Sequence, residues 1–201
     1  MGAILIRSAT AEDAAALSAF AARTFIETFG ADNSPEDMAA YVASTFTSEL
    51  QAAELADPQE LILIATSDDD EEAFVGYAHL GSGDAPTVIT NAASIELKRF
   101  YVASAYHGRG VAQTLMQRVL SESRQRGWRS LWLGVWERNA RAIAFYRKLG
   151  FSHIGSQPFQ LGTDVQTDWI MERLLDVPSS TAEGRSLSRP TDDANGDQGS
   201  G

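Results

Sequence analysis

Apolar residues recur at two different spacings along the chain, and this pattern predicts a mixed α/β fold. Near the start the spacing is helical, which predicts an amphipathic helix over residues 11–29 that ends at Gly30. A Ser-Pro pair at Ser34 and an N-capping Thr47 predict two further helices, and Pro58 bounds the second of them. Three helices are therefore expected before the main run of strands.

The rest of the chain carries the apolar runs typical of strands, with two helical segments between them. We expect strands over residues 4–7, 61–65, 73–80, 94–103, 130–136, 151–159 and 165–174, and helices over residues 113–126 and 139–149. An acidic turn at residues 68–72 makes a hairpin of the second and third strands. This order predicts one α/β domain with a mixed sheet over residues 1–175. Residues 176–201 are poor in apolar residues, which predicts a disordered tail.

The composition argues against several kinds of site. The chain has no Cys, and its three His stand far apart at positions 79, 107 and 153, so neither a disulfide nor a metal site is expected. No apolar run approaches the roughly 18 residues of a membrane span. The first residues also lack the apolar core of a signal peptide. We therefore expect a cytoplasmic protein without a metal or a membrane partner.

The charge is distributed unevenly along the chain, whose formal net charge is −11. Residues 1–90 hold 16 acids and 2 bases, whereas residues 91–176 hold 7 acids and 12 bases. The basic part suits a multiply phosphorylated ligand, and the acidic part suits a cationic one. The alternative is that the acidic residues only keep the protein soluble. The acidic balance of the whole chain argues against a nucleic-acid partner.

The turn at residues 106–112 has the sequence Tyr-His-Gly-Arg-Gly-Val-Ala and joins an expected strand to an expected helix. Its glycines let the main chain approach a bulky ligand, and a helix start offers unpaired N–H groups to phosphate. Residues 107–112 are therefore a candidate phosphate cradle, or else an ordinary Gly-containing turn. A dinucleotide fingerprint would need a third Gly where Gln113 stands, and the Gly-Lys-Ser/Thr of a P-loop is absent.

Two motifs, which follow each other along the chain in the order typical of one enzyme family, resemble the motifs of that family. Residues 95–102 (Ile-Glu-Leu-Lys-Arg-Phe-Tyr-Val) with the phosphate cradle resemble the core motif of the GCN5-related N-acetyltransferases (GNAT). Residues 132–139 (Trp-Leu-Gly-Val-Trp-Glu-Arg-Asn) and 142–151 (Ala-Ile-Ala-Phe-Tyr-Arg-Lys-Leu-Gly-Phe) resemble the second motif. The resemblance extends over residues 4–174.

One position of the core motif departs from the family pattern. His107 stands where the family usually has Gln or Arg. Main-chain N–H groups make most phosphate contacts in such turns, so the change should matter little. His107 either adds a hydrogen bond to phosphate or is a solvated turn residue.

The resemblance implies a fold and a co-substrate. The fold is a mixed, mostly antiparallel sheet of about six or seven strands flanked by helices, with a V-shaped splay between the central strands. The co-substrate is acetyl-CoA, and no metal is implied. The residues implied to bind it are Phe100, Tyr101, Val102, His107, Gly108, Arg109, Gly110, Val111, Ala112, Asn139 and Tyr146. Within this set, main-chain groups of residues 100–102 pair with the pantetheine arm like an added strand, and Asn139 both caps a helix and contacts that arm.

The chemistry of amine acetylation needs a base, an oxyanion donor and an acid. An alkylamine with a pKa near about 10.4 must lose a proton before it attacks, and Glu96 is the candidate base, directly or through water. The alternative for Glu96 is an ion pair. Strand alternation would put Glu96 on one face with Phe100 and Val102 unless a bulge intervenes. The N–H of Tyr101 or Val102 is the candidate oxyanion donor. Tyr146 matches the family tyrosine that protonates the CoA sulfur, and its alternative is a packed helix aromatic.

Within the family, residues 132–139 with 145–151, and residues 159–162 with 166–168, are similar to bacterial polyamine acetyltransferases of the spermidine/spermine type. The acceptor is therefore expected to be a small polyamine-like cation that attacks acetyl-CoA directly in a ternary complex. The candidate acceptor-binding residues are Glu27 and Trp136, although Trp136 could instead be a core tryptophan. Acidic residues on the first helices would attract the cation, namely Glu27, Asp32, Glu36 and Asp37.

Two other functions fit the same motifs. One is a protein or peptide acetyltransferase, which would need a wide, open acceptor groove. The other is a module that binds acyl-CoA without catalysis. Homodimers are frequent in such folds, so a homodimer is one open arrangement.

Overall fold

The computed structural model describes residues 2–68 and 74–176. Most of the expected acidic turn and the whole segment 177–201 lie outside the described residues. The helices are α1 (Ala14–Phe29), α2 (Pro35–Thr45), α3 (Ser48–Ala56), α4 (Val111–Gln125) and α5 (Ala140–Lys148). The strands are β1 (Ile4–Ser8), β2 (Leu61–Ser67), β3 (Gly76–Gly81), β4 (Ser94–Val102), β5 (Ser130–Trp136), β6 (Ser152–Leu161) and β7 (Asp164–Leu174). Every expected element is present, with ends shifted by a few residues.

The caps explain where the helices begin. Ser34 precedes Pro35, and its hydroxyl accepts a hydrogen bond from the N–H of Asp37. Thr47 caps α3 in the same way. Asn139 caps α5, where its Oδ1 accepts from the N–H of Ala142 at 3.1 Å. The capping role predicted for Asn139 is therefore confirmed.

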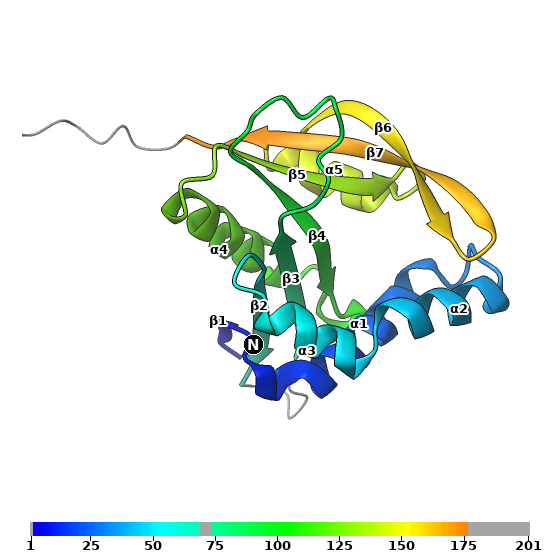
Figure 1. The fold of residues 1–201 in the computed structure, drawn as a ribbon. Helices are drawn as coiled ribbons and strands as arrows, with labels where there is room; N and C mark the ends of the chain where they lie inside the picture. Colours follow the sequence, from blue (N-terminus) through cyan, green and yellow to red (C-terminus); the bar gives the residue numbers. More distant parts are fainter. Residues whose placement is uncertain (1, 69–73, 177–201) are drawn as a thin grey trace, which may run out of the picture.

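The strands form one seven-stranded sheet in the order β1-β2-β3-β4-β5-β7-β6. Within it, β4 and β5 are parallel, and the other pairs are antiparallel. The parallel pair is short, because only residues 94–96 of β4 face residues 130–132 of β5. Beyond that point the two strands diverge, as Figure 1 shows. The mixed, mostly antiparallel sheet and its central splay are as predicted.

Helices cover both faces of the sheet because the central strands are apolar on both sides. In β2, Leu61 and Leu63 pack in one core cluster with α4 and α5, whereas Ile62 and Ile64 pack in another with α1 and α2. Strand alternation sends neighbouring residues to opposite faces. The sheet is therefore the middle layer of the domain.

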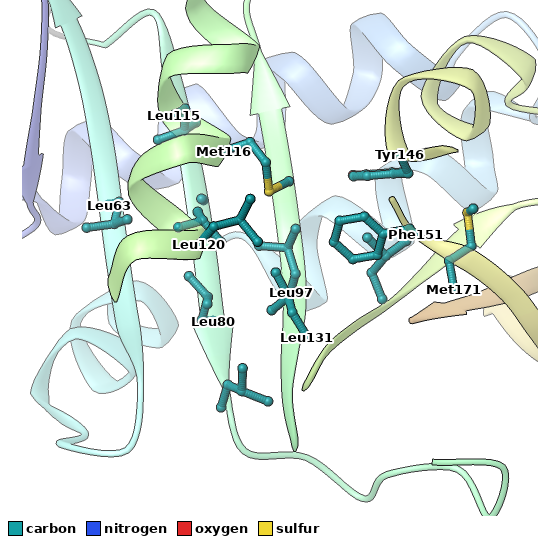
Figure 2. Close-up of a cluster of buried hydrophobic side chains, with 14 of the residues drawn as sticks. Leu63, Leu80, Leu97, Leu115, Met116, Leu120, Leu131, Tyr146, Phe151 and Met171 are labelled. Atoms are coloured by element: carbon teal, nitrogen blue, oxygen red, sulfur yellow. The ribbon is translucent and has the colours of Figure 1, made fainter. Parts of the chain in front are cut away.

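The larger core cluster lies between the sheet and helices α4 and α5. Figure 2 shows α4 side chains directed toward the sheet, with Tyr146 and Phe151 at the far end of the cluster. Tyr146 therefore belongs to the core on one side, and only 7% of its surface is exposed.

A β-bulge in β4 decides which residues face which helices. His79 pairs with Arg99 and Leu80 pairs with Leu97, so Lys98 has no partner in the register. Leu97 packs in the α4 cluster before the bulge, and Phe100 packs against that same cluster after it. Glu96, the neighbour of Leu97, therefore lies on the opposite face from Phe100. A shared face for Glu96, Phe100 and Val102 was expected only if no bulge intervened. Because the bulge is present, that shared face is not formed.

Candidate active site

The phosphate cradle, residues 107–112, joins β4 to α4. Gly108 and Gly110 have φ values of 76° and 85°, which are left-handed values that Gly adopts without steric cost. A Cβ on either residue would meet no atom within 4 Å. The first N–H groups of α4 have no acceptor within the helix, and the space beside the glycines leaves room for an anion. The local geometry thus fits a phosphate group.

A pocket of about 210 Å³ lies between this cradle and α5. It is lined by Phe100 and Val102 of β4, by His107, Gly108, Gly110 and Ala112 of the cradle, and by Tyr146 of α5. The structure therefore brings together most of the residues predicted to bind the co-substrate, although they come from three separate segments.

Two cradle residues, Arg109 and Val111, are not among those that line this pocket. Val111 is fully buried in a core cluster. The guanidinium of Arg109 lies over the ring of Tyr106, 5.3 Å from its centroid, and Arg109 is not part of the lining. The predicted roles of Val111 and Arg109 therefore depend on their N–H groups.

His107 is an exposed turn residue whose two ring nitrogens both have partners within the chain. Its Nε2 lies 2.8 Å from the carbonyl oxygen of Val102, and its Nδ1 lies 2.6 Å from Nη1 of Arg141. A guanidinium can only donate, so Nδ1 is the acceptor and Nε2 carries the proton that is donated to Val102. The ring thus joins the cradle to the first turn of α5. Arg141, which the motifs did not single out, lines the pocket as well.

A second cavity, of about 200 Å³, continues from the first between the diverging strands β4 and β5. Tyr146, Phe100 and Arg141 line both cavities, so the two form one cleft. Asn139 and Tyr101, which were also predicted to bind the co-substrate, line the second cavity. On the β5 side, Gly134, Val135 and Trp136 complete the wall.

Tyr146 stands where the two cavities meet. Its ring packs edge-on against Phe100, Phe145 and Phe151, with centroids 5.5–6.4 Å apart. Burial raises the pKa of its phenol well above the usual value. Tyr146 is therefore a protonated hydrogen-bond donor throughout the neutral range, and it is a packed aromatic at the same time.

The far end of the second cavity is aromatic and contains one carboxylate. Phe29 and Trp136 meet edge-on at 6.1 Å, and Tyr41 meets Phe159 at 5.6 Å. Asp168 of β7 lies among these rings, where burial raises the pKa of its carboxyl group to about 6.

The β6–β7 hairpin lines this end of the cavity and docks on the start of α2 (Figure 1). The N–H of Thr163 donates to Oδ1 of Asp37 at 2.5 Å, and the side-chain amide of Gln166 donates to Asn33. The hydrogen bond from Thr163, followed by the one from Ser34, lowers the pKa of Asp37. Asp37, one of the acids expected to attract a cation, therefore holds the hairpin.

Glu96 and Tyr146 are not brought together. Glu96 lines a separate pocket with Trp132, under the segment that connects β3 to β4, and it is absent from the lining of the cleft. Burial raises the pKa of Glu96, and a Cβ on Gly83 would lie 2.7 Å from one of its carboxyl oxygens. Its role as a base stays a prediction.

Glu27 and Trp136 line one further pocket beside the cleft, together with Asp32. Arg138 and Arg141 also line this pocket. The two residues predicted to bind the acceptor are therefore in the lining of the same pocket.

A buried network of charges supports β4 behind the cleft. Arg99 donates to both oxygens of Glu54 at 2.7 and 2.9 Å, and Lys98 donates to Glu60 at 2.5 Å. His79, with no exposed surface, lies 2.7 Å from Glu60. Each cation of β4 at the cleft therefore has its own carboxylate partner.

Sequence reasoning missed Asp168, Arg141 and the aromatic residues from α1, α2 and β6. These side chains come from segments far apart in the chain, so no local spacing links them. Asp168 could have been noticed as an acid directly before the apolar run of residues 169–171. The described ranges 2–68 and 74–176 contain no group of acidic or His side chains able to hold a metal. Among the same residues, no helix is long and apolar enough to cross a membrane.

The relatives that comparison with known proteins identifies agree with one another in their family. The model of the Acetyltransferase (GNAT) family matches residues 22–151. An uncharacterized N-acetyltransferase of Mycobacterium tuberculosis is 39% identical over 163 residues, which cover 81% of this chain and 98% of the relative. The fold resembles the PaiA N-acetyltransferase from Thermoplasma acidophilum in complex with coenzyme A (TM-score 0.69, 23% identity, covering 86% of this chain and 99% of that one). It also resembles a GCN5-related N-acetyltransferase from Kribbella flavida (TM-score 0.61, 27% identity, covering 86% and 98%).

Proposed function

Because this chain belongs to the acetyltransferase (GNAT) family, we propose that it transfers an acetyl group to the primary amine of a small, polyamine-like cation. Family membership makes the chain an acetyltransferase with acetyl-CoA as its co-substrate. The identity of the acceptor and the roles of individual residues are the proposed part.

The cradle and the cleft support one placement of acetyl-CoA. The pyrophosphate binds the N–H groups of residues 108–112, and Arg141 adds a charge-assisted hydrogen bond. The pantetheine arm lies in the splay between β4 and β5. There, beyond Glu96, the edge of β4 that faces β5 has no strand partner and offers its main-chain groups. The thioester then reaches Tyr146, where the two cavities meet.

The residues around that junction support direct transfer in a ternary complex. The amine attacks the thioester carbonyl, and the N–H of Tyr101 or Val102 stabilises the oxyanion. The phenol of Tyr146 gives its proton to the departing thiolate. Each of these groups lines the cleft, so no large movement of the chain is needed for them to act together.

The observation that supports a small acceptor is the contact between the β6–β7 hairpin and α2 at the far end of the cleft. The β6–β7 hairpin is hydrogen-bonded to α2 through Thr163 and Asp37, and the rings of Tyr41 and Phe159 fill the corner between them. A peptide acceptor needs an open groove that accepts extended chain. An amine on a narrow alkyl chain can instead enter among the aromatic walls.

We expect the KM for a polyamine to rise several-fold between about 0.01 M and about 1 M salt, because the Debye length falls from about 30 Å to about 3 Å over that range. Residues 1–90, which supply α1 to α3, carry 16 acids and 2 bases, so they attract a polycation at long range. Initial-rate measurements at fixed acetyl-CoA test this, with a monoamine of similar length as the control. A polyamine KM that stays constant over the whole range would count against the cationic acceptor.

We expect Arg141→Ala to raise the KM for acetyl-CoA about tenfold or more, because a hydrogen bond to a charged group contributes about 1.5–3 kcal/mol. The matched control is Arg147→Ala, which removes the same charge from the same helix. Arg147 lies over the ring of Trp169 at 5.4 Å and outside the lining of the cleft. Equal KM values in the two variants would remove Arg141 from the co-substrate site.

The deciding experiment for the function is a thiol-release assay with acetyl-CoA against polyamines, amino acids, amine antibiotics and peptides. Release with polyamines and not with peptides supports the proposal. Release with peptides alone would favour the protein acetyltransferase. The absence of release with every amine, in a protein that still binds coenzyme A, would favour a non-catalytic acyl-CoA-binding module.

A further inference from the structure

Asp168 is a carboxylate inside the acceptor end of the cleft that the structure leaves without a partner. In the part of the chain that the structure describes, its oxygens have no hydrogen bond and no ion pair. It lies on β7 opposite Trp136 of β5, and it lines the same cavity as Tyr146. Asp168 is half-buried, and withdrawing a carboxylate from water without a partner is costly, which is why such groups are usually paired or serve a ligand.

The neighbouring cations do not supply the missing partner. Lys98 is held by Glu60, and Arg99 is held by Glu54 through two hydrogen bonds. Asp168 therefore remains as an uncompensated negative charge facing the cavity.

The surroundings of Asp168 fit an alkylammonium group in size and chemistry. Gly134 of β5 leaves the carboxylate accessible, because a Cβ there would lie 3.1 Å from Oδ2 of Asp168. Tyr41 and Trp136 present aromatic rings to the same space, and such rings attract ammonium groups.

From these observations we propose that Asp168 binds the ammonium group of the acceptor and accepts its proton before the amine attacks acetyl-CoA. This inference rests on the proposed function and assigns to Asp168 the role of base that the sequence analysis gave to Glu96.

The proton and electron balance of the step is complete. The ammonium N–H bond breaks, the proton moves to the carboxylate of Asp168, and the lone pair of the neutral amine forms the new C–N bond. The C–S bond of the thioester breaks, and the thiolate takes a proton from Tyr146. The amide nitrogen then loses its second proton, which restores Tyr146 through solvent, and Asp168 releases its proton to solvent. The net products are the acetylated amine, coenzyme A and one proton.

The titratable groups around the cavity allow Asp168 to accept a proton and release it again. The titratable groups that share its cavity are Tyr41 of α2, Lys98, Arg99 and Tyr101 of β4, His107 of the cradle, and Arg141 and Tyr146 of α5. The tyrosines are neutral in the working range because burial raises the pKa of each. Burial also raises the pKa of Asp168 to about 6, so it is ionised at neutral pH yet basic enough to take a proton.

The test compares pH profiles of kcat/KM for a polyamine in the wild type, Asp168→Asn, Glu96→Gln and the control Asp164→Asn. Asp164 is an exposed acid on the same strand. In the wild type, kcat/KM should rise through about pH 6 and then stay level until the amine itself titrates near about pH 10. Asp168→Asn should lower kcat/KM at neutral pH about 100-fold or more, because it lacks the base. Its remaining activity should rise about tenfold per pH unit, as the neutral amine becomes available. Asp164→Asn should keep the wild-type profile.

The outcomes separate this inference from the function on which it rests. Wild-type turnover with a profile that Asp168→Asn leaves unchanged, or that Glu96→Gln alone abolishes, would overturn the role of Asp168 and leave the function standing. Absence of turnover in the wild type would overturn both. If Asp168→Asn does not fold, calorimetry of polyamine binding to the wild-type complex with coenzyme A decides. Affinity should then fall as pH decreases through about 6, and a constant affinity would refute the proposal.

Discussion

Turnover by the Tyr146→Phe variant is expected to fall about 100-fold or more, with little change in the affinity for coenzyme A. The substitution removes one hydroxyl and keeps the ring that packs against Phe100, Phe145 and Phe151. The loss should therefore appear in kcat, because a proton donor in the transition state contributes about 10²–10⁴-fold. Burial raises the pKa of the phenol, so the donor stays protonated at any working pH. Steady-state rates and calorimetry with coenzyme A measure the two effects separately.

Tyr106→Phe is the matched control, since Tyr106 lines the co-substrate pocket but not the cavity at the acceptor end. It should keep most of the wild-type kcat. A Tyr146→Phe enzyme that is as fast as this control would reduce Tyr146 to a packing residue.

The second large effect concerns stability. Glu60→Ala should lower the free energy of unfolding by about 3 kcal/mol, because it leaves a buried partner unpaired. His79 has no exposed surface and donates to Glu60, and Lys98 donates to the other oxygen. In a chain of this size the loss corresponds to a fall of roughly 6–12 °C in Tm. Thermal unfolding measures it, with the exposed Glu49→Ala as the control, which should cost only a few tenths of that energy.

The contribution of Glu60 should also depend on pH. Burial raises its pKa, but hydrogen bonds from His79 and Lys98 outweigh burial, so the pKa of the folded state lies below the usual value. The stabilisation is therefore complete above the unfolded pKa of about 4.3 and is lost as the pH falls through the lower folded value. The Tm difference between the wild type and Glu60→Ala should shrink in acid. A difference that grows in acid would contradict this account.

Glu60 matters beyond stability because it holds the bulge of β4. Lys98 is the bulge residue, and its ammonium group is anchored by Glu60. The bulge turns Phe100 toward Tyr146 and leaves Glu96 on the other face. The face assigned to each β4 residue thus depends on a contact with residues 20 or more positions away in the chain.

The half of the site that we propose to bind the co-substrate was predictable because its signals are local. The left-handed glycines, the helix start after them and the cap at Asn139 each depend on residues within a few positions of one another. Short-range rules of main-chain geometry are sufficient to derive them. The joining of His107 to Arg141 was not predictable in this way, because it spans 34 positions and depends on how α5 packs.

The sequence by itself determined the order of elements, the mixed sheet, the cradle and the family motifs, because hydrophobic spacing and turn chemistry are properties of neighbouring residues. Tertiary structure alone decided which carboxylate lines the cleft. A one-residue bulge reverses the face of every residue beyond it. The sequence at and around Lys98 contains no local signal that predicts this bulge. The closing of the hairpin onto α2, with Asp168 enclosed among rings from α1, α2 and β6, likewise joins segments more than a hundred residues apart. Their contact depends on packing, which no local pattern in the chain encodes.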